Sequence, residues 1–594
     1  MQNELTRQIT ISGRNFYKDG NIHYIHSGAV HYFRILPECW YDRLLKMKNC
    51  GLNAVETYVC WSLHERSEGV FDFKGRLDLG KFIDLAASLD LDVIVRPGPY
   101  ICAETDFGGM PSWLLNYKDI GLRSNDSVFM EKVARYFGKL AEIIVPRLVK
   151  NGGRIQMIQI ENEYGSYGND SEYKKSLVGL WKKLGADTLF FTADGAEYDM
   201  LQNGGTDGVL RALTFGSRPT KNFEELKRYP DQPDFCAEYW SGWFNTYGSD
   251  PYICDPDKPR RETGEFIDLG ASFNYYMFCG GTNYGMINGA NFDNDYMFQT
   301  TSYDYNAPIS EAGDMTDKYY SIKEELEKRT GKKIAIGVNN TEKKAYPSLK
   351  ASGFCELNEY LAGKTPIKST TPKSFESLGV DFGYVYYALD FDVWQDAEMK
   401  LMGLSDRATI TVDGKVRGVM GQGLDCNVVR FSTEKDYGRR KLGILVENRG
   451  RCNYGPRLKD PKGLHGGVLL HDKFLMNYEN YPLRAEINKK PIFGRLPEDS
   501  CRIGFYKFDL FIGEEPCDTF VYPSGFRNGC VYVNGTNIGR LCNCQPPQRT
   551  LYVAKELLKN GENVIIVFDT DGTDNPEIEF SDKPFYFDED KKRV

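Results

Sequence analysis

The sequence has no long apolar run and no excess of basic residues. None of its hydrophobic stretches approaches the roughly 18 residues of a membrane-spanning helix. Its 74 Lys and Arg residues are outnumbered by 83 Asp and Glu residues, which gives a net charge of −9. A surface that binds phosphate groups needs a basic face. These two absences argue against a nucleic acid and against a membrane as partners of the protein.

Histidine is scarce, and the cysteines lack the spacing of a metal site. The six His residues form no HxxxH pattern, and the 15 Cys residues include no CxxC pair, only a lone CxC at Cys542 and Cys544. No Gly-rich phosphate turn follows the first predicted strand. We therefore expect no metal and no cofactor. Thinly spread thiols, and a start without the apolar core of a secretory signal, predict a cytoplasmic protein.

Aromatic residues and glycine are abundant. The chain has 38 Tyr, 35 Phe, 7 Trp and 59 Gly residues. Aromatic side chains present flat apolar faces, with a polar tip in Tyr and Trp, and this suits the mixed surface of a sugar ring. The same residues favour packing in β-sheets, which is the more common cause of such an excess. Composition alone leaves both explanations open.

The first half of the chain alternates strand-like and helix-like segments. Short apolar runs that end in polar residues lie at 24–31, 53–59, 91–97, 155–161, 188–193, 208–215, 233–239 and 273–280. Helical patterns lie between several of them, at 37–50, 77–89, 127–150 and 171–184. Eight strands with intervening helices predict an α/β fold, a (β/α)8 TIM barrel over residues 1–325. A doubly wound sheet is the alternative.

Beyond residue 325 the pattern changes. A basic helical stretch at 320–334 is followed by short alternating runs that are broken by Gly, Asn, Asp and Pro. Such runs are typical of antiparallel all-β sandwiches. We predict a linker and a first sandwich at 326–495 and a second sandwich at 496–594, both jelly-roll-like.

Polar residues at strand ends are where a barrel carries its chemistry, because the loops after the strands form the active site. Carboxylates stand at or just after four predicted strands, at Glu56, Glu104, Glu161, Glu163 and Glu238. Two carboxyl groups that face each other across a glycosidic bond can cleave it. By pattern alone Glu161 and Glu163 are rival acids, since both would point the same way on a regular strand.

Long ordered motifs carry a family resemblance from about residue 20 to 325, and a looser one at 453–456, 465–468 and 531–540. The motifs are SGAVHYFRILPECWYDRLLKMKNCGLNAVETYVCWSLHE, RPGPYICAE, GGMPSWLL, QIENEYGSYG, AEYWSGWF, GGTNYG and TSYDYNAPISEAGD. With them the chain resembles the β-galactosidases of glycoside hydrolase family 35.

The resemblance implies a retaining, exo-acting enzyme that removes terminal β-linked galactose from an oligosaccharide or glycan, and a galactose-binding-like second sandwich. Glu163, the second glutamate of ENEYG, would be the acid/base, and Glu238, the glutamate of AEYW, the nucleophile. Further positions that match the family's sugar pocket are Tyr58, Cys102, Ala103, Glu104, Asn162, Trp243, Tyr303 and Tyr305.

Three positions depart from the family pattern. Thr105, Met286 and Cys542 stand where relatives carry an aromatic residue. They put in doubt the sugar and the linkage preference, for which β-1,3 is one candidate. Action on another β-glycoside, transglycosidation and a non-catalytic carbohydrate-binding role stay open as alternatives. The β-domains could cover the barrel mouth or form a homodimer contact.

Overall fold

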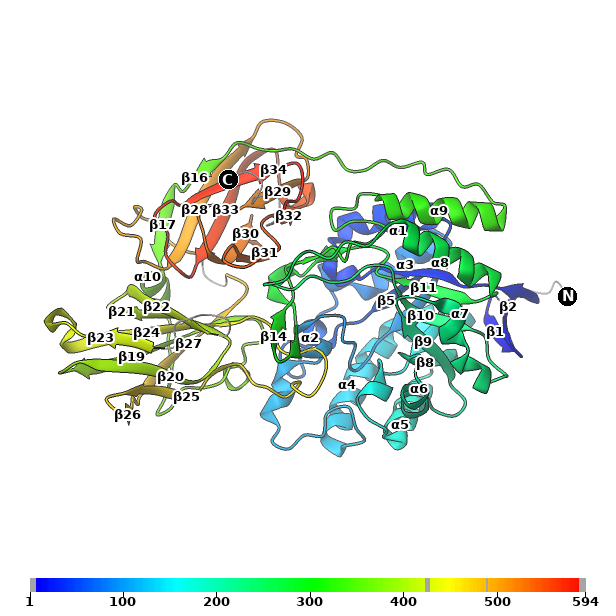
Figure 1. Ribbon diagram of the computed structural model, residues 1–594, viewed down its shortest axis with the longest axis horizontal. Helices are drawn as coiled ribbons and strands as arrows, with labels where there is room; N and C mark the ends of the chain where they lie inside the picture. Colours follow the sequence, from blue (N-terminus) through cyan, green and yellow to red (C-terminus); the bar gives the residue numbers. More distant parts are fainter. Residues whose placement is uncertain (1–6, 422–427, 488–489, 587–594) are drawn as a thin grey trace.

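The computed structural model describes residues 7–421, 428–487 and 490–586 of the chain. It has three parts, a barrel and two β-sandwiches that stand together on one side of it (Figure 1). No helix within these ranges is both long and apolar enough to cross a membrane.

Eight strands close into a parallel barrel in the order β10-β11-β4-β5-β6-β7-β8-β9. In chain order they are β4 (His26–Ala29), β5 (Ala54–Tyr58), β6 (Asp92–Arg96), β7 (Ile155–Gln159), β8 (Leu189–Gly195), β9 (Leu210–Phe215), β10 (Phe235–Trp240) and β11 (Ser272–Tyr276). Each lies within or overlaps one of the eight predicted runs. The predicted TIM barrel is confirmed, and closure of the sheet excludes the doubly wound alternative.

Helices cover the outside of the barrel (Figure 1). They are α1 (Trp40–Cys50), α2 (Trp61–His64), α3 (Leu79–Ser88), α4 (Ser127–Ile144), α5 (Ser171–Lys183), α6 (Tyr198–Gly204), α7 (Pro219–Phe223), α8 (Asp257–Asp268) and α9 (Asp317–Thr330). Asp78, Asp126 and Asp170 cap α3, α4 and α5 by accepting hydrogen bonds from backbone N–H groups of the first turn. The helix predicted at 320–334 ends earlier, because Gly331 takes the left-handed φ of 69° that terminates helices.

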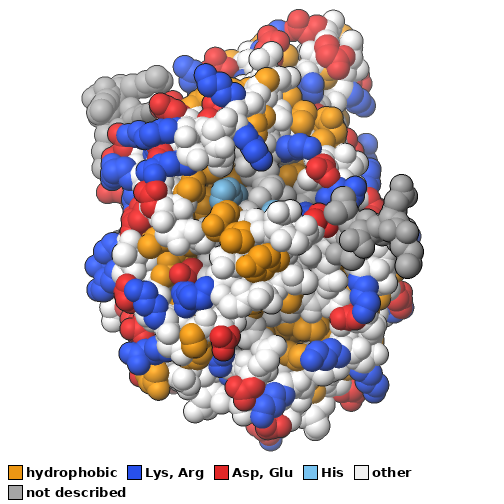
Figure 2. All heavy atoms as spheres, turned by 90° about the vertical axis from the view of Figure 1, so that its right-hand side faces the viewer, with side chains coloured by type: hydrophobic (Ala, Val, Ile, Leu, Met, Phe, Trp, Pro, Cys, Tyr) orange, Lys and Arg blue, Asp and Glu red, His pale blue; other side chains and the backbone are white. Residues whose placement is uncertain are grey.

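The N-terminal strands fill the end of the barrel at which its strands begin. They are β1 (Ile9–Ser12), β2 (Asn15–Lys18) and β3 (Asn21–His23). Ile9 and Phe16 are buried with interior residues of the barrel, and the ring of Phe16 packs edge-on against Phe235 with centroids 6.1 Å apart. Basic and acidic side chains mix over the face seen from this side (Figure 2). Because this end is filled, any site must form at the carboxyl ends of the strands.

The first sandwich is built from two antiparallel sheets, with strand orders β18-β27-β19-β24-β21-β22 and β23-β20-β25-β26. Its strands are β18 (Ile367–Ser369), β19 (Gly383–Val393), β20 (Ala397–Ser405), β21 (Arg407–Val412), β22 (Lys415–Gly421), β23 (Val428–Phe431), β24 (Gly438–Asn448), β25 (Gly463–Leu470), β26 (Lys473–Phe474) and β27 (Tyr478–Arg484). Aliphatic and aromatic side chains from both sheets form its core.

The second sandwich has strand orders β17-β28-β33-β30-β31 and β16-β34-β29-β32. Its strands are β16 (Leu349–Lys350), β17 (Gly353–Glu356), β28 (Gly504–Ile512), β29 (Thr519–Tyr522), β30 (Asn528–Val533), β31 (Thr536–Cys542), β32 (Leu551–Val553), β33 (Gly561–Asp569) and β34 (Glu577–Ser581). The all-β domains after the barrel are therefore confirmed, and their jelly-roll connection stays a prediction.

The second sandwich takes strands from both sides of the first. The backbone of 349–356 pairs with β34 and β28, although the predicted range of the first sandwich, 326–495, includes it. The linker reaches β16 by running from α9 along the top of the molecule (Figure 1). After α10 (Leu357–Leu361) the chain enters the first sandwich at β18. The first sandwich is thus an insertion in the second.

Candidate active site

A cavity opens at the carboxyl ends of the barrel strands, where the loops after β6, β7, β10 and β11 meet. Its lining residues are Ile101, Cys102, Ala103, Glu104, Asn162, Glu163, Glu238, Trp240, Trp243, Tyr276 and Tyr305. This set contains eight of the ten residues that the sequence placed at a sugar site. The other two, Tyr58 and Tyr303, lie directly behind it, where they hydrogen-bond to Glu238 and Glu104.

Glu238 lies on β10, and two hydrogen-bond donors and one cation hold its carboxylate. The hydroxyl of Tyr58 donates to Oε1 over 2.6 Å, the guanidinium of Arg96 lies 2.6 Å from the same oxygen, and the indole N–H of Trp240 donates to Oε2 over 3.0 Å. A register shift in β10 after Cys236 marks an irregularity of the kind that re-aims a side chain. Donors of this kind stabilise a carboxylate in its ionised form.

Glu163 follows β7 in a different environment. Its φ of 45° is left-handed, and its backbone N–H donates to the carbonyl of Ala193 over 3.0 Å. The hydroxyl of Thr214 donates to its Oε1 over 2.9 Å. Burial, followed by the negative charge of Glu238, raises the pKa of Glu163 to about 8. This carboxyl group therefore keeps its proton at neutral pH.

Glu161, the rival acid by pattern, is turned away from the cavity lining and held in an ion pair. The guanidinium of Arg123 donates to both of its oxygens, over 3.0 and 2.7 Å, and the hydroxyl of Tyr173 donates over 3.0 Å. The strand ends at Gln159, and Glu161 takes a left-handed φ of 62°. Because the strand is not regular here, the two glutamates do not point the same way.

Asn162 contacts the two residues that hold Oε1 of Glu238, Tyr58 and Arg96. Its side-chain oxygen accepts hydrogen bonds from Arg96 over 2.8 Å and from Gln159 over 3.1 Å, and it lies 2.7 Å from the hydroxyl of Tyr58. These contacts fix which end of the amide is the oxygen. The amide nitrogen is the group that can donate to a hydroxyl of a ligand.

Glu104 lies against a cluster of tyrosines. The hydroxyl of Tyr303 donates to its Oε2 and is 3.1 Å from the hydroxyl of Tyr276. The guanidinium of Arg34 lies over the ring of Tyr303, 3.7 Å from its centroid. Burial raises the pKa of Glu104 to about 7. The group can therefore accept or donate a hydrogen bond near neutral pH.

The loop that carries Glu104 has an unusual backbone. Cys102, Ala103 and Glu104 have φ values of 55°, 49° and 49°, and three consecutive left-handed residues other than glycine are costly. The guanidinium of Arg34 donates to the carbonyl of Ala103 over 2.6 Å, and the hydroxyl of Thr105 donates to that of Cys102 over 2.9 Å. These contacts hold the loop in place beside the cavity.

The first sandwich supports the same loop from outside the barrel. The side-chain amide of Asn453 donates to the sulfur of Cys102 over 3.4 Å, and the backbone carbonyl of Asn453 accepts from the hydroxyl of Tyr100 over 2.5 Å. The next residue, Tyr454, hydrogen-bonds to Ser166. Burial raises the pKa of Tyr454, and the nearby negative charge of Glu163 raises it further. The sandwich is therefore part of the wall of the active-site end.

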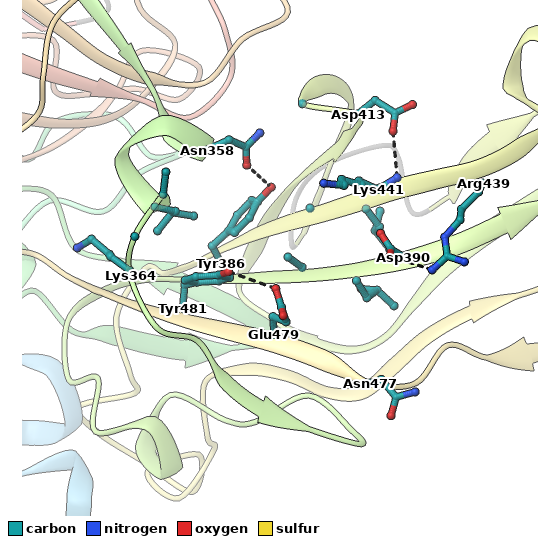
Figure 3. A pocket seen from close by; sticks show the side chains of 18 of the residues that line it. Asn358, Lys364, Tyr386, Asp390, Asp413, Arg439, Lys441, Asn477, Glu479 and Tyr481 are labelled. Carbon is teal, nitrogen blue, oxygen red and sulfur yellow. Dashed lines mark hydrogen bonds and ion pairs between the residues drawn. The ribbon is translucent and has the colours of Figure 1, made fainter.

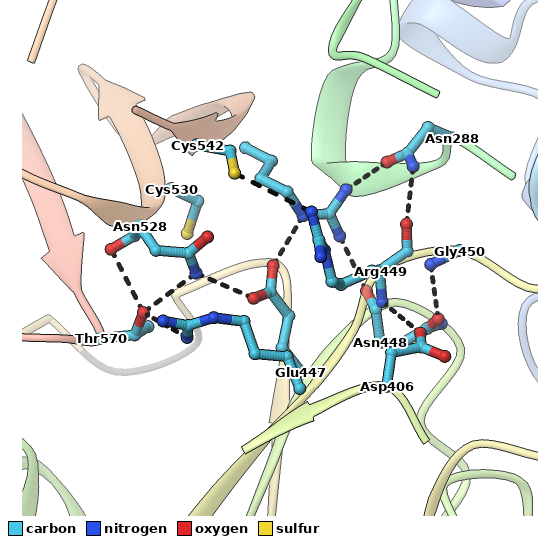
Figure 4. A network of polar contacts seen from close by, with 12 residues as sticks. Asn288, Asp406, Glu447, Asn448, Arg449, Gly450, Asn528, Cys530, Cys542 and Thr570 are labelled. Atoms are coloured by element: carbon cyan, nitrogen blue, oxygen red, sulfur yellow. Dashed lines mark hydrogen bonds and ion pairs between the residues drawn. The ribbon is translucent and has the colours of Figure 1, made fainter. Parts of the chain in front are cut away.

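The three residues that depart from the family pattern lie outside the cavity lining. Thr105 and Met286 are buried, and Cys542 is buried at the junction of the sandwiches and the barrel, where its sulfur contacts Arg449 (Figure 4). Cys544 lies with its sulfur 3.3 Å from that of Cys542. In the part of the chain that is described, no three His, Cys, Asp or Glu side chains come together as a metal site requires.

Sequence reasoning does not assign four residues that the structure brings to the site, Arg96, Thr214, Trp240 and Tyr276. Arg96, Thr214 and Trp240 stand at the ends of barrel strands, and Tyr276 closes β11. Their position is the only signal that the sequence offers. Their contacts join strands that are far apart along the chain, and these contacts appear only once the barrel is closed.

A model of the glycosyl hydrolases family 35 matches residues 15–329, which is more than half of the chain and includes all three cavity glutamates, Glu104, Glu163 and Glu238. The chain belongs to glycoside hydrolase family 35. Two further models of this family's domains match 372–484, described as the first all-beta domain of beta-galactosidase, and 503–563, described as its galactose-binding domain.

Relatives of this family 35 chain match it over nearly their full lengths. Human "Beta-galactosidase-1-like protein 2" is 38% identical and covers 96% of this chain, which spans 91% of that protein. "Beta-galactosidase" of Bos taurus is 36% identical, with 98% and 94% covered. "Beta-galactosidase 1" of Dictyostelium discoideum is 35% identical, with 95% and 91% covered.

As a family 35 member the chain is a glycoside hydrolase, and its cavity has the groups that this chemistry requires. One carboxyl group, Glu163, holds a proton, and its pKa responds to the charge of the other, Glu238. An acid and an ionised carboxylate in one cavity can act together on a single glycosidic bond.

Proposed function

We propose that this family 35 enzyme removes terminal, non-reducing β-linked galactose from oligosaccharides by a retaining double displacement, with Glu238 as nucleophile and Glu163 as acid/base. The observation that carries the proposal is the contrast between the two carboxyl groups. Two hydrogen-bond donors and the positive charge of Arg96 stabilise Glu238 as an anion, while burial and the charge of Glu238 keep Glu163 protonated.

In the first step Glu163 gives its proton to the glycosidic oxygen as the bond to the anomeric carbon breaks. Glu238 attacks that carbon from the opposite face and forms the glycosyl-enzyme ester. Arg96 and Tyr58 fix the attacking carboxylate, since each contacts Oε1. Arg96 and Tyr58 also contact Asn162. A ligand held by the amide of Asn162 would therefore be positioned relative to the nucleophile.

The second step follows from the coupling of the two groups. Once Glu238 is an ester its negative charge is lost, and the pKa of Glu163 falls because that charge was one of the causes that raised it. Glu163, now ionised, can take a proton from water. The water attacks the anomeric carbon, releases the sugar and restores the anion of Glu238.

Recognition of the sugar is assigned to the rest of the lining. Glu104, with Tyr303 behind it, and Asn162 would bind hydroxyl groups, and Trp243 and Tyr305 would cover an apolar sugar face. Cys102 and Ala103 would contribute through their constrained backbone. Exo action is what the family resemblance implies, and the first sandwich holds the loop that lines one side of the cavity. Galactose is supported by the names of the relatives.

A panel of nitrophenyl β-glycosides tests the proposal. The wild type should hydrolyse the galactoside fastest, and Glu238→Gln should lower kcat on the order of 10³-fold or more. Glu142→Gln, an exposed glutamate on α4, is the matched control and should keep full activity. Failure of the wild type to hydrolyse any glycoside would favour a carbohydrate-binding role, and faster cleavage of another sugar would overturn the galactose assignment.

The acid/base and the retaining outcome are tested together with Glu163→Ala. This variant should lose most activity on substrates with poor leaving groups. Added azide should restore turnover and give the β-galactosyl azide, because azide needs no general base to attack the glycosyl-enzyme. An α-azide would contradict retention.

The linkage preference is tested by galactose release from β-1,3-, β-1,4- and β-1,6-linked disaccharides, with β-1,3 the expected favourite. Transfer of galactose to a second sugar in the same assays would favour a transglycosidase. A cytoplasmic location and a homodimer stay predictions.

A further inference from the structure

A second, larger cavity lies far from the catalytic glutamates, on the first sandwich. Its volume is about 860 Å³, within the roughly 300–1,000 Å³ of small-molecule sites. It runs across the neighbouring strands β27, β19 and β24 to the turn after β21, and α10 with the residues after it forms one edge (Figure 3). We call it the sheet groove.

The floor of the sheet groove is low because the central side chains are small. Along β19 the residues Val385, Tyr387 and Leu389 belong to the core of the sandwich, so the alternate residues face outward. One of these, Ala388, pairs with Gly443 on one side and with Glu479 on the other. Two small residues, Ala388 and Gly443, therefore lie side by side between the pair Tyr386 and Tyr481 and the pair Asp390 and Lys441.

The aromatic side of the sheet groove is made by Tyr386 and Tyr481, whose ring centroids are 6.3 Å apart. Tyr386 lies over Gly443, since a Cβ at that glycine would be 1.9 Å from the tyrosine hydroxyl. The hydroxyl of Tyr386 donates to the side-chain oxygen of Asn358 on α10 over 3.1 Å (Figure 3). Tyr386 is only 6% exposed, so the partly exposed ring of Tyr481 is the main aromatic face on this side of the groove, and Tyr386 supports it.

The opposite side is polar and electrically balanced. Arg439 donates to Asp390 over 3.1 Å, and the backbone N–H of Lys441 donates to Asp413 over 3.0 Å (Figure 3). The charged residues that line the groove are three cations, Lys364, Arg439 and Lys441, and three anions, Asp390, Asp413 and Glu479. A groove without net charge does not favour an anion such as a phosphate, nor a basic peptide.

We propose that the sheet groove binds an uncharged oligosaccharide chain, as a site separate from the catalytic cavity. Tyrosine rings offer apolar contact to sugar C–H groups, and the facing row of carboxylates, a guanidinium and an ammonium offers both acceptors and donors to hydroxyls. The groove lies outside 503–563, the segment matched as galactose-binding. A glycan held here would raise the local concentration of chain ends for the barrel.

The proposal rests on the part of the proposed function that makes the protein a glycan-degrading enzyme, and not on the galactose specificity. Electrophoresis in native gels that contain a dissolved polymer tests it. The probes are three neutral polymers, β-galactan, β-glucan and xylan, and one anionic polymer, polygalacturonate. All proteins carry Glu238→Gln so that no chain is cleaved. The Glu238→Gln protein, which is the parent of the other variants, should be retarded by at least one neutral polymer, and excess free galactose should not remove this retardation. Polygalacturonate should retard it less.

Ala388→Trp, which fills the floor, should abolish the retardation. When the same substitution is made in the active enzyme, which keeps Glu238, hydrolysis of nitrophenyl galactoside should stay unchanged. Asp392→Ala is the matched control, since Asp392 is exposed on the same strand but lies outside the groove lining. If Ala388→Trp fails to fold, as judged by thermal melting, the double substitution Glu479→Ala with Tyr481→Ala should weaken retardation about tenfold, equivalent to 1.4 kcal/mol.

Three results would overturn the proposal. These are no retardation by any neutral polymer, equal retardation of the parent and the filled variant, and stronger retardation by polygalacturonate. Loss of retardation on adding galactose would assign the binding to the catalytic cavity instead. None of these results depends on which nitrophenyl glycoside the enzyme prefers, so a failure of the galactose assignment is seen separately.

Discussion

Glu163 and Glu238 carry the same carboxyl group and differ in what surrounds it. Tyr58 and Trp240 donate hydrogen bonds to Glu238 and Arg96 forms an ion pair with it, whereas Glu163 accepts from Thr214 and is otherwise desolvated. The proposed division of labour between acid and nucleophile follows from this count of donors, so it can be altered one donor at a time.

Removal of the Thr214 hydroxyl should shift the pH dependence of the enzyme. The acid step needs Glu163 protonated, so kcat/KM should fall as pH rises through its pKa of about 8. The hydrogen bond from Thr214 favours the ionised form and lowers that pKa. Thr214→Val should therefore move the falling limb to higher pH by roughly 0.5–1. Thr214→Ser, which keeps the hydroxyl, is the control, and a limb that moves to lower pH would contradict the assignment.

Arg96 should matter for stability as well as for activity. Its side chain is fully buried and pairs with Glu238, so Arg96→Met leaves a buried carboxylate without its cation. We expect the free energy of unfolding to fall by about 3–5 kcal/mol, measured by denaturant titration.

A double-mutant cycle separates this charge effect from lost packing. Arg96→Met should cost less in a Glu238→Gln background, where Glu238 is not left unpaired and only Glu56, 3.8 Å from Arg96, still loses its cation. Equal costs in both backgrounds would assign the loss to packing around Arg96.

At the scale of elements, the site depends on loops that touch backbone to backbone. After β10 the N–H of Trp243 donates to the carbonyl of Tyr305 over 3.1 Å. A Cβ at Gly242 would lie 1.9 Å from that same oxygen. The loop after β10 and the segment after β15 (Ser302–Tyr303) can therefore meet only because residue 242 has no side chain.

Gly242→Ala should push these two loops apart and widen the cavity where Trp243 and Tyr305 line it. We expect KM for nitrophenyl galactoside to rise about tenfold or more, a loss of roughly 1.4 kcal/mol in binding, with a smaller change in kcat. Gly179→Ala is the matched control, because nothing lies within 4 Å of a Cβ there and alanine is favoured within α5. A KM that does not change would show that the loops yield without cost.

The elements were largely predictable and the details of the site were not. Barrel strands are short apolar runs between turns, so all eight could be placed from the sequence. The choice between Glu161 and Glu163 could not be made from the pattern, because it depends on left-handed residues after Gln159 and on Arg123, which is distant in sequence. The contact of Asn453 with the active-site loop likewise needs the packed domains.

At the scale of the whole molecule, buried ion pairs tie the three parts together. Arg540 of the second sandwich pairs with Glu447 of the first over 2.6 Å and donates to Asn288 of the barrel over 2.6 Å. Arg451 of the first sandwich pairs with Asp106 of the barrel over 2.9 Å. These side chains are buried, so opening of the junction would expose charges that hold each other only in the assembled form.

We therefore expect the domains to unfold together. Calorimetry of the wild type should give one transition, although domains joined by small interfaces usually move and melt separately. Arg540→Met should lower the melting temperature and separate the transitions, because it leaves Glu447 buried without its partner. Lys400→Met, an exposed change on β20, is the control. Two well-resolved transitions in the wild type would contradict this coupling.

The insertion of one sandwich into the other also sets an order of events during translation. The barrel is complete when α9 leaves the ribosome, and β16 and β17 emerge next. Their partners, β34 and β28, follow only after the whole inserted sandwich. Until then two strands offer open edges, which pair readily with other chains. A product truncated before β28 would carry a finished catalytic barrel and an unfinished, adhesive sheet.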